Sequence, residues 1–164
     1  MTTHLPEFDW SSSAGAWEIS FGGDTITLDE RPPVWATESI LLVCSLGDLR
    51  ENWDSYGARP IKAAVAVATI DLILNVLGSN LPPPTVVPTV RGTIQLEWHR
   101  GEEDLEIEVE SAGCVRVVFE DHRTGDKLEQ TAGNRAQSAP RRTGSCRSGR
   151  KENGFRKARL CSSD

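Results

Sequence analysis

Residues 94–119 have the sequence IQLEWHRGEEDLEIEVESAGCVRVVF, in which apolar and polar residues alternate in three runs. The runs cover residues 94–99, 105–110 and 115–120, and a polar segment with a glycine separates each run from the next. Alternation over four to eight residues between tight turns is typical of β-strands. The pattern predicts a three-stranded antiparallel meander with one apolar and one charged face.

Two helical segments precede these strands. Between residues 34 and 51, apolar residues recur at helical spacing and predict an amphipathic helix. Its expected apolar stripe consists of Trp35, Ser39, Leu42, Leu46 and Leu49. From Pro60 to about residue 77 nearly every residue is apolar, which is typical of a helix buried on most sides. The segment is too short, and contains too many polar residues, to span a membrane.

The N-terminal region contains a weaker strand pattern. Residues 17–21 and 25–28 alternate around Gly22-Gly23, which predicts a β-hairpin. Residues 1–14 show no pattern, and we expect a loose N-terminal arm there. A short fourth strand of the meander is expected at about residues 126–130, after Thr124-Gly125.

The predicted helices and the meander can bury each other's apolar faces. Each helix must bury an apolar face, and the meander offers an apolar surface. The short break at residues 52–59 predicts that the helices form a hairpin. We therefore predict a single α+β domain over residues 15–130, a two-layer sandwich in which the helical hairpin packs on one face of the meander. Trp98 is expected near the centre of that contact.

Charge divides the chain into two parts. Residues 1–129 contain 9 basic and 22 acidic residues, whereas residues 130–164 contain 9 basic and 2 acidic residues. The acidic part argues against nucleic-acid binding, for which only the basic part is suited. From residue 131 the apolar periodicity stops, so residues 131–164 are predicted to be a basic, disordered tail. The abrupt change suggests a second hypothesis, an out-of-frame reading, which translating the other two frames would test.

Three segments carry a resemblance to a known group of proteins. They are NWDSYGA at residues 52–58, GTIQLEWH at residues 92–99 and DLEIEV at residues 104–109. In this order, with helices and a Pro-rich spacer between them, they resemble a family of small bacterial proteins without an assigned activity. The resemblance covers about residues 46–129. It implies the α+β arrangement and supplies neither an activity nor a cofactor.

The NWDSYGA segment is the first candidate site. Trp53, Asp54 and Tyr56 would form a recognition patch if they lie on an exposed loop between rigid elements. A structural role is the alternative. In that case Trp53 packs under the helical hairpin, Asp54 caps a turn, and Gly57 provides a positive φ.

The carboxylates of the meander are the second candidate site. Glu97, Glu106 and Glu108 would lie near one another on the charged face, where they could bind a hard divalent cation for hydrolysis. The alternative is a solvated polar face, which the alternation itself requires. His99, His122 and Cys114 lack the spacing of a zinc site.

These observations favour a non-catalytic protein-interaction domain over an enzyme. Its strong acidity points to a basic protein partner, as in an antitoxin-like or immunity-like pair. The alternative function is a metal-dependent hydrolase that uses the sheet carboxylates. No cofactor is indicated, because no Gly-rich phosphate loop is present. The four cysteines are far apart and no secretory signal is recognisable, so we expect a bacterial cytoplasmic protein.

Overall fold

The computed structural model describes residues 11–13, 16–75, 81–133 and 158–161. In this part of the chain, helices and antiparallel sheets form an α+β structure, which confirms the predicted fold class. The helices are α1 (Val34–Ser45), a single 3₁₀ turn η1 (Leu46–Asp48) and α2 (Ala63–Asn75). Within the described residues, neither α1 nor α2 has the length and apolarity needed to cross a membrane.

The larger sheet contains the predicted meander. Its antiparallel strands, in spatial order, are β4 (Thr85–Pro88), β5 (Ile94–Arg100), β6 (Glu103–Ser111), β7 (Cys114–Asp121) and β8 (Asp126–Gly133). The three alternating runs are β5, β6 and β7, and the expected fourth strand is β8. The sequence pattern did not predict β4. The register confirms the apolar face, because Leu96 lies opposite Ile107, which lies opposite Val117.

The smaller sheet has the order β1–β2–β3–β9. Its strands are β1 (Ser11–Ser13), β2 (Ala16–Phe21), β3 (Asp24–Leu28) and β9 (Ala158–Cys161). The predicted N-terminal hairpin is β2–β3, in which Ile19 lies opposite Ile26.

Strand β9 belongs to the segment predicted to be a disordered tail, yet it pairs with β3 along its whole length. Strand β8 also continues past residue 130, to Gly133. Strand β1 likewise falls within the expected N-terminal arm, residues 1–14, so described strands lie beyond both expected ends of the domain. Residues 134–157 and 162–164 of the expected tail, and residues 1–10 of the expected arm, lie outside the described residues, and disorder there stays a prediction.

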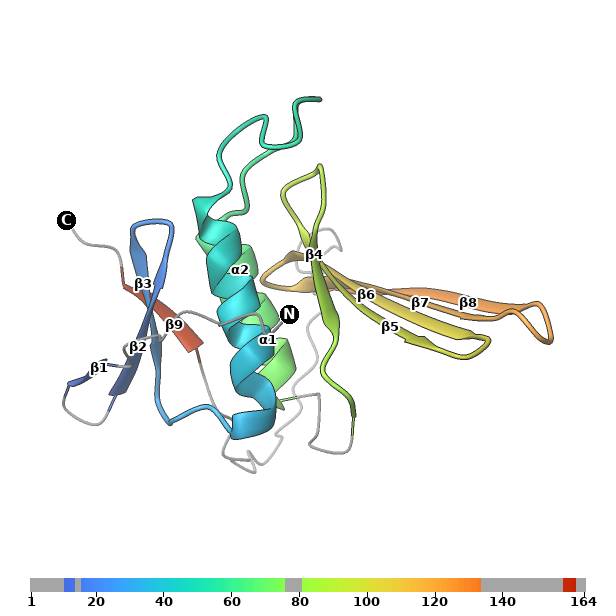
Figure 1. Cartoon of the computed structure of the whole chain (residues 1–164), viewed down its shortest axis with the longest axis horizontal. Coiled ribbons are helices and arrows are strands. Elements are labelled where there is room, and N and C mark those ends of the chain that lie inside the picture. Colours follow the sequence, from blue (N-terminus) through green and yellow to red (C-terminus); the bar gives the residue numbers. More distant parts are fainter. Residues whose placement is uncertain (1–10, 14–15, 76–80, 134–157, 162–164) are drawn as a thin grey trace, which may run out of the picture.

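The two helices lie between the two sheets (Figure 1). Helix α2 contacts β9 of the smaller sheet and β5 and β6 of the larger one, and α1 contacts β2 and β4. The helices also contact each other. The helix layer thus has a sheet on each side, whereas the sequence pattern predicted a sheet on one side only. The difference arises because the N-terminal hairpin and β9 build a second sheet.

The position between two sheets explains which helix residues are buried. The buried residues of α1 are Ala36, Ser39, Ile40, Val43 and Cys44. Of the stripe that the sequence predicted, Ser39 is buried, but Leu42 is 38% exposed. The predicted stripe was therefore rotated from the observed one, because a helix that contacts two sheets buries a wider surface than one apolar stripe.

The core of the larger sheet lies nearer to the β4–β5 turn than expected. Ile94 and Leu96 are fully buried, whereas Trp98 is half-buried and packs at the margin of the core. The expectation that Trp98 lies at the centre of the contact is therefore wrong. Strands β5–β8 extend beyond the helices (Figure 1), so the described part of the chain puts no second layer over the far end of the sheet.

Gly22 in the β2–β3 turn of the smaller sheet and Gly47 in η1, which follows α1, approach each other closely. A Cβ atom on Gly22 would lie 2.5 Å from the carbonyl oxygen of Gly47, and one on Gly47 would lie 2.9 Å from the carbonyl carbon of Phe21. Real Cβ atoms do not approach backbone this closely. Gly47 therefore allows η1 to pack directly on the β2–β3 turn.

Candidate functional site

The NWDSYGA segment forms a loop that its own hydrogen bonds hold in one conformation. The N–H of Asn52 donates to the carbonyl oxygen of Ala58 (2.7 Å), and the N–H of Gly57 donates to Oδ1 of Asn52 (2.8 Å). Oδ1 of Asp54 accepts from the N–H groups of Tyr56 (2.8 Å) and Ala58 (2.9 Å). These two backbone donors hold the pKa of Asp54 below its usual value.

The loop therefore has the turn chemistry that the structural alternative predicted for Asp54 and Gly57. Asp54 caps the turn, and Gly57 has a φ of 96°. Asn52 and Ser55 also have positive φ values, 64° and 67°. Non-glycine residues adopt this region rarely, so the hydrogen bonds must outweigh the local strain.

The loop is attached to the turn between β4 and β5. Nε1 of Trp53 donates to the carbonyl oxygen of Arg59 (3.2 Å), and the N–H of Arg59 donates to the carbonyl oxygen of Val90 (3.0 Å). Trp53 is half-buried, and it is not among the described residues that pack on the core. Tyr56, in contrast, is 94% exposed. The loop thus presents a large aromatic side chain to solvent on an ordered backbone.

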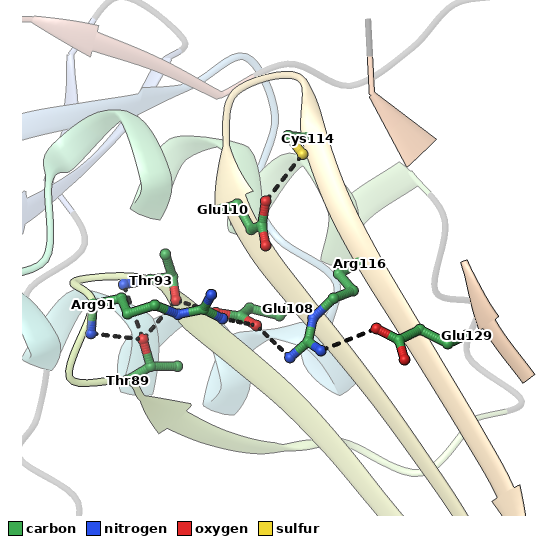
Figure 2. A network of polar contacts seen from close by, with 8 residues as sticks. All are labelled: Thr89, Arg91, Thr93, Glu108, Glu110, Cys114, Arg116 and Glu129. Atoms are coloured by element: carbon green, nitrogen blue, oxygen red, sulfur yellow. Dashed lines mark hydrogen bonds and ion pairs between the residues drawn. The ribbon is translucent and has the colours of Figure 1, made fainter. Parts of the chain in front are cut away.

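On the charged face of the larger sheet, Glu108 is buried rather than solvated, with an exposed fraction of 2%. Figure 2 shows its carboxylate between two guanidinium groups. Nη2 of Arg91 lies 2.5 and 2.6 Å from the two carboxylate oxygens, and Nη2 of Arg116 lies 2.9 Å from Oε2. The hydroxyl of Thr93 donates to Oε1 at 2.5 Å. Arg116 also contacts Glu129 at 3.3 Å.

These partners keep Glu108 ionised although it is buried. Burial acts to raise the pKa of Glu108, but the hydrogen bonds from Thr93 and Arg116 and the charge of Arg91 outweigh it, and the pKa is lowered. Because its oxygens accept four hydrogen bonds, Glu108 is engaged in a structural network. The expectation of a solvated face is therefore wrong for Glu108, whereas its role in a metal site stays a prediction.

Glu97 and Glu106, the other two residues of that predicted site, are brought together. They are Cα partners across β5 and β6. Glu108 lies two pairs further along, opposite Gln95, and its carboxylate is bound as described above. Within the described residues, no group of three or more His, Cys, Asp and Glu side chains has the arrangement of a metal site.

A second polar cluster, in which the sequence pattern did not predict the part of His122, lies at the far end of this face. Asp104 bridges two imidazoles, with Oδ1 2.7 Å from Nδ1 of His99 and Oδ2 2.6 Å from Nε2 of His122. Its hydrogen bonds raise the pKa of both histidines, and the two histidines lower the pKa of Asp104. Glu97 approaches His99 (3.5 Å) and Glu120 approaches His122 (3.7 Å). All these groups are partly exposed, so the cluster responds to the pH of the solvent.

Cys44 and Cys114 are free thiols. Cys44 is buried in the core, and burial raises its pKa to about 12. Sγ of Cys114 lies 3.2 Å from Oε2 of Glu110, and this hydrogen bond raises the pKa of Cys114. Neither thiol is therefore activated as a nucleophile, since the thiolate is the reactive form.

We compared the chain with models of protein families, with curated proteins and with solved structures, and none of them matches it. The resemblance to the family of small bacterial proteins therefore stays an expectation.

Proposed function

We propose that this protein is a non-catalytic interaction domain that binds a basic protein through the NWDSYGA loop. The observation that carries the proposal is Tyr56, which is 94% exposed on a loop held by internal hydrogen bonds. Tyrosine and tryptophan are enriched among the residues that dominate binding energies. A side chain on an ordered loop also loses less conformational entropy on binding than one on a mobile loop.

The surroundings of Tyr56 support the same role. Val90, on the turn to which the loop is bonded, is 60% exposed, and Arg91 beside it is engaged with Glu108. Two exposed apolar side chains on neighbouring turns provide a small contact area. The acidic residues of the rest of the domain would speed association with a basic partner. A role in an antitoxin-like or immunity-like pair in the bacterial cytoplasm fits these properties, and the unpaired thiols of Cys44 and Cys114 fit a reducing compartment.

The test is affinity capture at about 50 mM NaCl, where charge interactions are strongest. The immobilised full-length protein is exposed to a lysate of its source cells, and a stoichiometric partner is then purified and titrated. We expect Tyr56→Ala to weaken that binding at least about tenfold, a hot-spot effect. Val34→Ala is the matched control, because Val34 is 93% exposed on α1. Capture of no stoichiometric partner, or equal effects of the two substitutions, would refute the proposal.

One observation favours the alternative of a metal-dependent hydrolase. Glu97 and Glu106 lie directly opposite each other, and paired carboxylates can bind a divalent cation. Calorimetric titration of the full-length protein with Mg²⁺, Mn²⁺ and Zn²⁺ separates the two functions. Micromolar binding that is lost in both Glu97→Ala and Glu106→Ala would favour the hydrolase over the interaction domain.

A further inference from the structure

The apolar face of the larger sheet continues beyond the helices. Trp98, Leu105, Phe119 and Leu128 form one row of Cα partners across β5–β8. Nearer the helices, the equivalent row begins with Leu96, which is fully buried. In the outer row the first three residues are half-buried, and Leu128 is 51% exposed. The sheet thus carries more apolar surface than the described part of the chain covers.

A Pro-rich segment turns this surface into a groove, which we call the distal groove. Its floor consists of Trp98, Leu105 and Phe119, and its wall includes Leu81 and Pro82. Nε1 of Trp98 donates to the carbonyl oxygen of Pro82 at 2.7 Å, which fastens the wall to the floor. Proline also restricts the backbone of the wall. The groove is therefore preformed.

The size and the charge of the distal groove limit what it can bind. Its volume is about 520 Å³, within the range of ligand pockets, about 300–1,000 Å³. Glu97 and Glu103 line it together with Arg100 and His99. The strand ends around it, residues 97–106 and 119–128, contain eight Asp or Glu residues against three Lys or Arg and two His. An occupant should therefore be apolar where it meets the floor and basic where it meets the edge.

The same charges disfavour a second copy of this chain as the occupant. In a two-fold symmetric contact each surface meets itself, so the acidic edge of one copy would face the acidic edge of the other. Like charges placed opposite each other across an interface oppose association. A partner with Lys or Arg beside its apolar residues meets no such repulsion.

We propose that the distal groove binds a short segment of a partner protein that carries large apolar residues next to Lys or Arg. The site is separate from the NWDSYGA loop. That loop is bonded to Val90 at one end of β5, whereas Trp98 lies near the other end. Within β5, the four residue steps from Ile94 to Trp98 alone span roughly 13 Å at strand spacing. The groove can therefore bind whether or not the loop does.

The test uses three fluorescent eight-residue peptides and the full-length protein. One contains Leu and Phe flanked by Lys, the second has Glu in place of Lys, and the third has Ser in place of Leu and Phe. Fluorescence anisotropy should show saturable binding of the first peptide alone, weakened when NaCl is raised from about 50 to 300 mM. Equal binding of the second peptide, or of the third, would overturn the proposal, because charge or apolar contact would then be irrelevant.

Two matched substitutions locate the bound peptide. Leu81→Lys adds a positive charge to the wall at a residue that is 49% exposed, and Val90→Lys adds the same charge at a residue that is 60% exposed beside the loop. We expect Leu81→Lys to weaken binding at least about tenfold and Val90→Lys to leave it within about twofold. Circular dichroism melts check that both variants fold. Equal weakening by the two variants, or a larger effect of Val90→Lys, would place the peptide outside the groove and overturn the proposal.

Self-association is the competing use of this surface. Sedimentation velocity over about a hundredfold range of protein concentration would detect it. We expect no dimer that depends on the groove. A dimer that Leu81→Lys abolishes would show that a second copy occupies the groove, and the partner proposed here would be wrong.

Discussion

Replacing Glu108 with glutamine should destabilise the protein although the side chain keeps its shape. The carboxylate is 2% exposed and accepts hydrogen bonds from two guanidinium groups and one hydroxyl. A hydrogen bond to a charged group contributes about 1.5–3 kcal/mol, and a neutral one about 1 kcal/mol. Loss of the charge toward Arg91 and Arg116 should therefore lower the free energy of unfolding by about 2 kcal/mol.

That value is below the 3–5 kcal/mol or so typical of breaking a buried ion pair. The reason lies in the exposure of the partners, because the side chain of Arg91 is 57% exposed and that of Arg116 is 33% exposed. Both guanidiniums can turn toward water when Glu108 loses its charge. For a chain of this size the melting temperature should fall by about 4–8 °C.

Urea denaturation at pH 7, followed by circular dichroism, measures the effect, and an unchanged m-value would show that the change lies in stability alone. Glu106→Gln is the matched control on the same strand. Glu106 lies opposite Glu97, and removing one of two facing like charges should leave stability unchanged or slightly higher. If Glu108→Gln and Glu106→Gln have equal effects on the free energy of unfolding, the reasoning about the buried network is refuted.

The pH dependence of Glu108 supplies a second readout. Because its folded pKa is lowered, its stabilising contribution is present above the unfolded pKa, about 4.5, and is lost as pH falls through the folded pKa. The difference in unfolding free energy between wild type and Glu108→Gln should thus be full at pH 7 and shrink below about pH 4.5. A difference that stays constant down to about pH 3 would contradict an ionised Glu108.

Three further predictions concern other parts of the molecule. Gly47→Ala should lower the free energy of unfolding in urea melts by about 1–3 kcal/mol, because the added Cβ meets backbone that cannot move aside. The control Asp48→Ala changes an exposed neighbouring residue and should lower it by less than about 0.5 kcal/mol. Asp54→Ala should leave global stability nearly unchanged but speed amide exchange at Tyr56, whose N–H loses its acceptor; unchanged exchange would argue against an ordered loop. Asp104→Asn should lower the melting temperature most near pH 5 and less at pH 8. The raised pKa values of the two histidines stabilise the fold fully below about pH 6.5, and the lowered pKa of Asp104 stabilises it above about pH 3.8, so both contributions are present near pH 5. An equal decrease at both pH values would contradict this.

Local alternation was sufficient to predict most of the larger sheet. Strands β5 and β6 and the β2–β3 hairpin alternate because each buries apolar residues on one face, and β7 alternates except at Val118, so the sequence placed them correctly. Strand β4 was missed because it contains a proline and only four residues. Strand β9 was missed because its surroundings are polar and its partner lies more than a hundred residues away. Local periodicity contains no information on such a pairing.

The candidate sites were likewise predictable only where local residue types determine the structure. The turn chemistry of Asp54 and Gly57 follows from residue type and could be predicted. The burial of Glu108 could not, because alternation assigns every polar residue of a strand to the same solvated face. One signal was present in the sequence. Arg116 lies at the position of β7 that pairs with Glu108 once the meander is in register, and an Arg opposite a Glu indicates an ion pair.

The pairing of β3 with β9 has a consequence for how the chain folds. Thr25 and Cys161 are Cα partners, as are Leu28 and Ala158, so one edge of the smaller sheet is completed only when residues at least 130 positions apart meet. Pairings of such high contact order form slowly, because the entropy of closing the loop is lost before the contact forms. Until then β3 presents an unpaired edge to other chains. During refolding at high protein concentration, aggregation should therefore begin at this edge, and the yield of native protein should fall as concentration rises.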